Sequence, residues 1–479
     1  MATISSAGIG SGLDVNSIIT QLMAIEKRPL TTLQAKGSTI QSTVSEYGKI
    51  KSAVSTLRDL AAKLASQTTW AQTTASSSGT AVSAVTNGSA QGTYSVEVQS
   101  LASVQTLATG TAASATALAG AGNLHIELGT WGAGQTSFTA NPSATAVDIT
   151  VTATDTLSDV RDKVNSSGAG VTALIMTDAN GSRLLLRSNT SGAASAFRTT
   201  VTDADGVNND ASGLSRLAFD PSAGVSVMTQ NQVAANAAAT INGLTVSSAT
   251  NTLANIIDGL TLNLSAQTTG PVTVNVVADT ASLKKTITDF AAAYTAVNAL
   301  IGGDTKYDPT TRTGGILQGD SSAVGLQRAL RTLAGSASSA SSVFGHLSDV
   351  GLQIQGDGSL TVNSTQLDSA LGNLAETRKL FAASSLTDPT LDGFAKRFRV
   401  AADAMLAIDG VLTTRTDGLG QQLQRNQTDQ NNMQNRLTGI EARLRAQYTA
   451  LDATMARLTS KSAYITQQIA AWSGNSSSK

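Results

Sequence analysis

The sequence lacks several residue types that chemistry at a protein site usually needs. It contains no cysteine among 479 residues, which excludes disulfides, thiolate nucleophiles and thiolate metal sites. His125 and His346 are the only histidines, and neither lies in a nucleophile-elbow or zinc-protease pattern. We therefore expect no enzyme activity, and the sequence suggests no cofactor and no metal. Aromatic residues make up 4% and charged residues 14%, a composition that suits thin sheets and long helices better than large globular cores.

Neither sign of charge dominates, and long apolar runs are missing. Thirty-two Lys and Arg against 33 Asp and Glu give a net charge of -1, so nothing indicates nucleic acid or an anionic membrane surface as a partner. No segment reaches the roughly 18 apolar residues of a membrane span, so we expect no membrane insertion. The first cation is Lys27, which argues against a Sec signal peptide. We expect a cytoplasmic protein or one exported intact.

What the chain does have is a long amphipathic helix at its C-terminal end. Two apolar columns run through it, Leu423, Gln430, Leu437, Leu444, Leu451, Leu458, Ile465 and Trp472, and beside them Met433, Ile440, Tyr448, Met455 and Ile469. This spacing is the a/d seam of a coiled coil, about 80 Å long over residues 419–472. Asn426, Gln430 and Gln447 are predicted to place polar groups in the seam, which can fix its register.

The N-terminal end carries a matching pattern. Asp14 is a suitable N-cap, and apolar residues then repeat at helical spacing: Ile18, Ile19, Leu22, Met23 and Ile25. Pro29 should kink this helix or begin a new one, after which the stripe continues to Leu64. The simplest partner for one terminal helix is the other. The chain between them is then an excursion from a helical stalk.

The middle of the chain favours strands. Alternating β-branched segments predict strands at 93–98, 124–128, 148–151, 239–246, 260–264 and 272–276, the last two on either side of Gly270-Pro271. Residues 156–164 predict a short capped helix, and Asn180-Gly181 predicts a hairpin turn. Helical periodicity returns from Leu283 and continues in 322–334, 366–382 and 391–408, with a small β element at 352–362. The fold class is therefore α+β and multidomain: a helical coiled-coil stalk formed by both termini, with two nested β-rich head domains.

This order gives four expected parts. Terminal leg helices comprise residues 1–45 and 420–479, and a mainly helical stalk domain comprises 46–75 and 279–419. A β-rich head domain comprises 76–120 and 235–278, and a second α+β head domain, 121–234, is inserted into it. Residues near Leu57, Ile287 and Phe290 are expected to pack within one subunit. The legs are expected to pack against other protein chains only in the assembly. We therefore expect them to be disordered in the free subunit and to fold on assembly.

Two short motifs have alternative interpretations. Residues 8–12, Gly-Ile-Gly-Ser-Gly, precede a helix as a phosphate-binding loop would. Such loops follow a strand in a βαβ unit, and only seven residues come before Gly8, so we expect instead a flexible end whose helix docks in assembly. Residues 203–210 carry oxygen donors at alternate positions, as calcium loops do. An EF-hand needs Gly and Glu where this chain has Asn208 and Leu214, so a solvated turn is the alternative, and the sequence leaves calcium binding open.

Several segments, in order, resemble one known family. Gly10-Ser11-Gly12-Leu13-Asp14, with Ser17-Ile18-Ile19, Gln21-Leu22-Met23, Glu26 and Pro29-Leu30, is similar to the opening signature of the bacterial flagellar filament cap family (FliD, hook-associated protein). The resemblance continues through 92–98, 241–243, 257–262, Phe290 with Tyr294, 319–321 and 358–360. Residues 156–165 with 184–192 are similar to a motif inserted in flagellins and their caps.

The resemblance implies a closed homo-oligomeric ring at the extracellular tip of the filament. Beneath it, exported flagellin would be retained, fold and be inserted. Members leave the cell through the flagellar channel without a cleaved signal peptide. The implied partners are self, flagellin, hook-filament junction proteins, and the export chaperone and apparatus. Host mucin is a further candidate partner, since some members bind it.

Two other functions stay open from the residues alone. One is a secreted oligomeric adhesin, and the other is a different axial protein, either a flagellin or a hook-filament junction protein. For assembly, the expected interaction residues all lie in the two legs: Leu13, Asp14, Ile18, Leu22, Met23, Leu437, Leu444, Leu451, Leu458, Ile465 and Trp472. Of these, we expect Leu13, Ile18, Leu22, Leu458, Ile465 and Trp472 to lack partners within the monomer.

Overall fold

The chain divides into two compact units. A computed structural model describes residues 14–88 and 90–475, with only the backbone for 472–475. One unit combines Met1–Thr69 with Thr280–Lys479, and we call it the helical unit. The other, Trp70–Asp279, is the inserted unit. The predicted fold class is confirmed: both ends of the chain build a helical stalk, and the β-rich part is nested between them.

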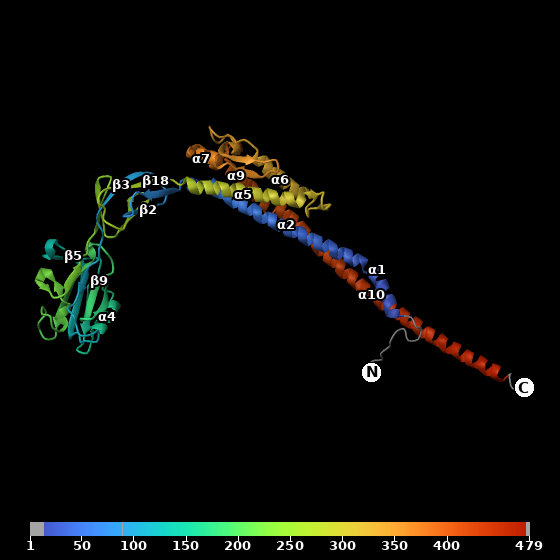
Figure 1. Cartoon of the computed structure of the whole chain (residues 1–479), viewed down its shortest axis with the longest axis horizontal. Helices are drawn as coiled ribbons and strands as arrows, with labels where there is room; N and C mark the ends of the chain where they lie inside the picture. The colour runs from blue at the N-terminus through green and yellow to red at the C-terminus, as the bar shows by residue number, and fades with distance from the viewer. Residues whose placement is uncertain (1–13, 89, 476–479) are drawn as a thin grey trace. The chain divides into compact units, whose positions relative to one another are not determined.

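The helical unit is built on two long helices that run side by side, α2 and α10 (Figure 1). Its helices are α1 Val15–Glu26, α2 Arg28–Ala65, α5 Thr280–Thr305, α6 Ser321–Ala334, α7 Ser364–Leu371, α8 Leu374–Ala382, α9 Phe394–Leu406 and α10 Val411–Asn475. Short strands β19 Tyr307–Asp308 and β20 Thr313–Gly314 form one hairpin, and β21 Leu352–Ile354 and β22 Leu360–Val362 form another. With 65 residues, α10 is about 97 Å long. It begins earlier than the periodicity alone predicted.

Local sequence explains where α1 and α2 begin. The Asp14 carboxylate accepts a hydrogen bond from the backbone N–H of Ser17 at 2.9 Å, which confirms the predicted N-cap. α1 ends at Glu26, and α2 begins at Arg28 with Pro29 in its first turn, where proline loses no hydrogen bond. Pro29 therefore opens a new helix, one of the two predicted outcomes.

The core of the helical unit lies where α2, α5 and α9 meet. Leu57, Ile287 and Phe290 are fully buried, which confirms that these residues pack within one subunit. Phe398 of α9 packs edge-to-face against Phe290, with ring centroids 5.1 Å apart. Aromatic residues are scarce in this chain, and the helical unit concentrates several of them at this one crossing.

Apart from one ten-residue helix and a few short helical turns, the regular structure of the inserted unit is β-strand. Its strands are β1 Thr73–Ser77, β2 Val82–Thr86, β3 Gly92–Ser100, β4 Thr106–Ala108, β5 Gly122–Trp131, β6 Phe138–Ala140, β7 Val147–Val151, β8 Val171–Asp178, β9 Gly181–Ser188, β10 Ala196–Asp203, β11 Phe219–Asp220, β12 Val225–Ser226, β13 Thr229–Gln232, β14 Ala237–Ile241, β15 Leu244–Ser248, β16 Thr252–Ile257, β17 Leu260–Leu264 and β18 Val272–Ala278. It also holds the ten-residue helix α4, Leu157–Ser166. The short helix α3, Gln67–Trp70, precedes β1.

One hydrophobic core of the inserted unit lies between two sheets. A five-stranded sheet in the order β1-β18-β3-β14-β15 and a three-stranded sheet in the order β16-β17-β2 contribute its side chains, among them Val96, Leu262 and Val274. The two strands beside Gly270-Pro271, β17 and β18, belong to different sheets. The turn therefore passes the chain from one sheet to the other, a connection that alternation within each strand does not reveal.

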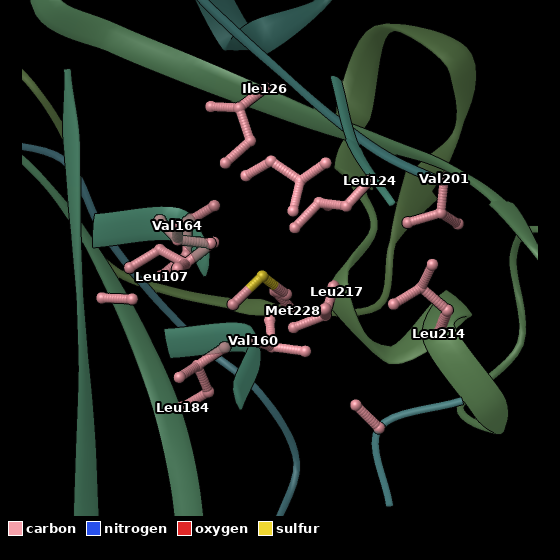
Figure 2. Close-up of a cluster of buried hydrophobic side chains, with 14 of the residues drawn as sticks. Leu107, Leu124, Ile126, Val160, Val164, Leu184, Val201, Leu214, Leu217 and Met228 are labelled. Carbon is pink, nitrogen blue, oxygen red and sulfur yellow. The ribbon is translucent and has the colours of Figure 1, made fainter. Parts of the chain in front are cut away.

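A second core is formed by residues 107–228 (Figure 2). It lies among the sheet β13-β4-β9-β8, the sheet β12-β11-β10-β5-β6 with β7 on β5, and helix α4. Thr156 and Asp159 form a reciprocal capping box at the start of α4, and Asn180-Gly181 turns β8 into β9, so both predictions are confirmed. Leu107, Ala112 and Ala119 of the low-complexity stretch belong to this core.

Candidate assembly surface

Helix α1 covers one part of the apolar stripe of α10. Val15, Ile19 and Met23 are buried in a cluster with Leu30 and Leu437, and these five are each at most 9% exposed. Four half-buried residues of α10 complete the cluster: Met433, Ile440, Leu444 and Tyr448. The two ends of the chain therefore do pack on each other, as the matching periodicities predicted.

Beyond Tyr448 the side chains of the same stripe are exposed. Leu451 is 44%, Leu458 56% and Ile465 57% exposed, and Met455 and Ile469 are also exposed. We call this set, Leu451, Met455, Leu458, Ile465 and Ile469, the distal stripe. It extends over about 27 Å of helix. Apolar side chains repeated at this spacing on a soluble helix are typical of a surface that packs against another protein element.

Helix α1 has a second apolar row, beside the row that is buried against α10. Ile18 is half-buried, while Leu22 is 36% and Ile25 57% exposed. We call Ile18, Leu22 and Ile25 the outer face of α1. Helix α1 thus carries two apolar rows, one at residues 15, 19 and 23 and the other at residues 18, 22 and 25. The first row packs within the chain, and the second remains available to contact another protein.

A polar contact fixes the register of α2 and α10. Gly37 leaves space against α2 for two amide side chains of α10, of which Asn426 is 4% exposed. Gln430 donates to the Asn426 side-chain oxygen at 2.6 Å and to the backbone oxygen of Leu33 at 3.4 Å. The predicted polar residues of the seam are thus confirmed for Asn426 and Gln430. The prediction was wrong for Gln447, which is exposed because the stripe there runs through Leu444 and Tyr448.

An ion pair ties α10 to α6 near the start of α10. Arg415 donates to the Asp320 carboxylate at 2.7 and 3.1 Å, and the same carboxylate caps α6 by accepting from the N–H groups of Ser322 and Ala323. Burial opposes ionisation of Asp320, but the Tyr47 hydroxyl, Arg415 and the backbone N–H of Ala323 together outweigh it and hold its pKa below the usual range. Burial, reinforced by Asp320, raises the pKa of neighbouring Tyr47 to about 12. The Arg415–Asp320 ion pair therefore lies near the start of α10, at the opposite end of that helix from the distal stripe.

The predicted interaction residues fall into three groups. Asp14 caps α1, and Met23 and Leu437 are buried in the seam, with Leu444 half-buried beside them. Ile18 and Leu22 lie on the outer face of α1, and the distal stripe contains Leu451, Leu458 and Ile465. Leu13 and the side chain of Trp472 lie outside the described residues. Ile25 is an exposed leg residue that this selection omitted, although its helical spacing from Leu22 could have found it.

The acidic loop at 203–210 is held by its own hydrogen bonds. The Asp203 carboxylate accepts from the backbone N–H of Ser215 at 2.8 Å, and the backbone N–H of Asp203 donates to Asn208 at 2.8 Å. Burial would raise the pKa of Asp203, but the hydrogen bonds from Ser215 outweigh it and lower the pKa. The described residues contain no group of three His, Cys, Asp or Glu side chains that could hold a metal ion. The glycine-rich run at 8–12 lies outside the described residues.

The remaining histidines and helices add little to a site. His125 Nδ1 lies 2.8 Å from the Asp148 carboxylate across a pair of strands, and His346 lies 3.8 Å from Asp349 at a short turn. Both pairs are partly exposed on the protein surface. Of the helices that the structure describes, none is both long enough and apolar enough to span a bilayer.

Family models match most of the chain. The flagellar hook-associated protein 2 N-terminus matches residues 11–105, and the corresponding C-terminus matches 234–460. The flagellin hook IN motif matches residues 134–190, within the inserted unit. These matches include α1, α2 and most of α10. They therefore cover the contact between α1 and α10 described above.

Whole-length relatives and one solved structure agree with these matches. Flagellar hook-associated protein 2 of Escherichia coli (strain K12) is 32% identical, with 100% of each chain covered. The B-type flagellar hook-associated protein 2 of Pseudomonas aeruginosa PAO1 is 30% identical over 97% of each. The crystal structure of the D1-D2-D3 domains of the flagellar cap protein FliD from Escherichia coli aligns with a TM-score of 0.59 at 28% identity, covering 78% of this chain and 99% of that one. The chain belongs to the flagellar hook-associated protein 2 family, the FliD proteins that cap the flagellar filament.

Proposed function

We propose that this filament cap protein acts as a closed ring of identical subunits. The ring retains exported flagellin at the distal end of the filament and promotes its folding and insertion. The work is steric and mechanical, and we assign it no catalytic step. Subunits reach the tip through the flagellar channel without a cleaved signal, assisted by the export chaperone, and assemble beyond the hook-filament junction proteins.

The observation that carries this proposal is the distal stripe. A soluble protein gains nothing as a monomer from five exposed apolar side chains along a helix, since each is stabilised only when another surface covers it. The stripe continues the seam that α1 already occupies, so its natural occupants are helices. We therefore propose the leg residues Leu13, Ile18, Leu22, Leu451, Leu458, Ile465 and Trp472 as contacts with neighbouring subunits and with the filament, while Asp14, Met23, Leu437 and Leu444 hold the two legs together so that these contacts can form.

We also propose the division of labour among the four parts of the chain. Residues 1–45 and 420–479 form the legs, and 46–75 with 279–419 form the stalk domain. Residues 76–120 with 235–278 and the insertion 121–234 form the head plate that closes the end of the filament. The cores of the inserted unit support two head domains. Of these boundaries, the one at 120 has the least structural support, because Leu107, Ala112 and Ala119 pack in the core of the later domain.

The first test is deletion of the gene, with flagellin assayed in the medium and filaments viewed by electron microscopy. Bare hooks and unpolymerised flagellin outside the cell are the expected result. Normal filaments would contradict the proposal. Normal filaments together with lost attachment to surfaces or to host mucin would favour the adhesin alternative.

The second test asks whether the distal stripe is needed. We expect Leu451→Gln combined with Leu458→Gln to leave the subunit folded but to release flagellin as the deletion does. Ala453→Gln with Ser460→Gln is the matched control, because these exposed residues have the same seven-residue spacing on the opposite side of α10. Filament length and secreted flagellin are the measurements. Equal growth with both pairs would remove the stripe from the mechanism.

A further inference from the structure

Two uncovered apolar faces of this chain have the same spacing. On the outer face of α1, Ile18, Leu22 and Ile25 are separated by four and then three residues. At the start of the distal stripe, Leu451, Met455 and Leu458 are separated by four and then three residues. Helices with this spacing can interlock their side chains along a common seam.

The distal stripe is also continuous with a surface that an α1 helix already covers. Within the chain, α1 packs on the stripe from Met433 to Tyr448, and the next apolar residue along the same stripe is Leu451. The same kind of helix therefore fits the next part of the stripe. The chain's own α1 cannot supply it, since that helix is held on the preceding turns by Val15, Ile19 and Met23.

Charge favours the same partner. From Asp14 to Glu26 the α1 segment carries two acidic side chains, Asp14 and Glu26, and no basic one. From Leu451 to Ile469, α10 carries Arg457 and Lys461 against Asp452, a net charge of +1. Lys27 and Arg28 follow this segment and balance its two acidic side chains, so an α1 segment adds no net repulsion to the distal stripe, whereas two distal stripes packed together would place like net charges side by side.

We propose that the distal stripe of one subunit packs against the outer face of α1 of a second copy of this chain. The two surfaces are different, so the contact is heterologous, and a heterologous contact repeated around an axis generates a ring. This inference rests on the proposed function, for which it supplies the subunit contact in the legs. Each subunit then uses α1 twice, once on its own α10 and once on its neighbour's.

The absence of cysteine makes disulfide trapping a direct test. Leu22→Cys and Met455→Cys, prepared as two full-length proteins with different tags, are mixed and mildly oxidised. Leu22 and Met455 are the central residues of the two triplets, so they face each other whichever way the helices run. We expect linked dimers carrying both tags, about tenfold above either protein alone, since a disulfide needs the two Cα atoms within about 7 Å.

A matched control is Ala24→Cys mixed with Met455→Cys. Ala24 is exposed on α1, but it lies on the side away from the outer face, so we expect little linkage. Equal linkage of both mixtures would overturn the inference. So would efficient self-linkage of Leu458→Cys, which would mean that distal stripes pair with each other, or an internal disulfide between Ile9→Cys and Leu458→Cys, which would mean that the chain's own N-terminal segment covers the stripe.

A cellular experiment separates this inference from the proposed function. The full chain carrying both Leu22→Cys and Met455→Cys is expressed in the deletion strain, and filament growth and oxidised products are scored together. A ladder of linked subunits is the expected result, with filament growth below that of the wild-type chain because both substitutions lie in the proposed contact. Growth without a ladder would overturn the inference and leave the cap function standing. Normal filaments in the uncomplemented deletion strain would contradict the cap function itself. If the double variant does not grow filaments, the mixed purified proteins decide.

Discussion

At the scale of single residues, the seam between α2 and α10 depends on one missing side chain. A Cβ on Gly37 would lie 2.7 Å from the Asn426 side-chain oxygen and 3.0 Å from Gln430 Nε2. Gln430 donates to the Asn426 side-chain oxygen and to the α2 backbone oxygen of Leu33, so the two amides cannot move away without losing hydrogen bonds. The glycine is therefore required for packing, despite its low helix propensity.

We expect Gly37→Ala to lower the free energy of unfolding by about 1–2 kcal/mol, because the clash outweighs the gain in helix propensity. Denaturant unfolding of the purified protein measures the change. Gly48→Ala, in the same helix with no heavy atom within 4 Å of the added Cβ, is the control. It should instead stabilise α2 by up to about 1 kcal/mol. The same sign of change at both positions would contradict the role given to Gly37.

A second residue-scale prediction concerns acid. The folded pKa of Asp320 is lowered, and an Asp in the unfolded chain has a pKa of about 3.9, so the stabilisation is complete above about pH 4 and is lost as the pH falls through the lower folded value. Asp320→Asn should cost about 1–2 kcal/mol at pH 7, less than a fully buried pair because Arg415 is about one-third exposed.

Thermal unfolding of both proteins at pH 7 and at several values below pH 4 checks this. The difference between wild type and Asp320→Asn should shrink as the pH falls. Asp289→Asn, which removes the exposed partner of Lys285, should have little effect at any pH. A difference for Asp320→Asn that persists unchanged in strong acid would show that the charge is not its origin.

Residue-scale features were the most predictable from the sequence. The Asp14 cap, the Thr156 cap and the Asn180-Gly181 turn are local, so a few neighbouring residues determine them. Gln447 was misplaced because a seven-residue repeat drifts on a straight helix, and one position of error moves a side chain by 100°. The space left by Gly37 depends on a residue nearly 400 positions away, which no local pattern contains.

At the scale of elements, the attachment of α1 is narrow. Only Val15, Ile19 and Met23 of this helix are buried, and a helix of 12 residues is not stable alone in water. Its structure therefore depends on the seam with α10. The same narrowness keeps its outer face free.

We expect Met23→Ala to release α1 from α10, since removing a buried methionine side chain costs roughly 2–3 kcal/mol. Amide hydrogen exchange should then show residues 15–26 exchanging much faster while residues 283–300 remain protected. Ile25→Ala is the control, because that side chain is 57% exposed and leaves no cavity. Fast exchange in α1 with the control, or unchanged exchange with Met23→Ala, would be the contrary result.

Sequence periodicity identified the long helices and many of the strands, but it missed others, among them β1, β2, β10 and β16, and it did not identify all the partners. Strands β17 and β18 were predicted from their alternating pattern. Their membership of different sheets follows from the pairing of β17 with β2 and of β18 with β1, two strands that lie far away in the sequence. Likewise the repeat in α10 does not say where cover by α1 stops. That point depends on the register set at Gly37 and on the length of α1.

At the scale of the whole molecule, the legs are expected to differ in stability from the stalk domain. In the free subunit, the apolar side chains of Leu451, Met455, Leu458 and Ile465 are exposed, and helices without tertiary packing are marginal. We expect the amides of residues 451–469 to exchange rapidly in the free protein and to become protected on assembly. Protection in the free protein equal to that of residues 283–300 would contradict this.

The two ends of the inserted unit are joined to each other. Thr73 pairs with Ala278 at the start of the β1–β18 ladder, and the backbone N–H of Asp279 donates to the Gln72 oxygen at 2.9 Å. The first and last strands of the unit are therefore hydrogen-bonded neighbours. The points where the chain enters and leaves the unit stay one strand spacing apart, whatever lies between them. Chimeric caps could therefore carry head domains of other sizes joined at this strand pair, while the stalk helices keep their own sequence and the distance between their ends.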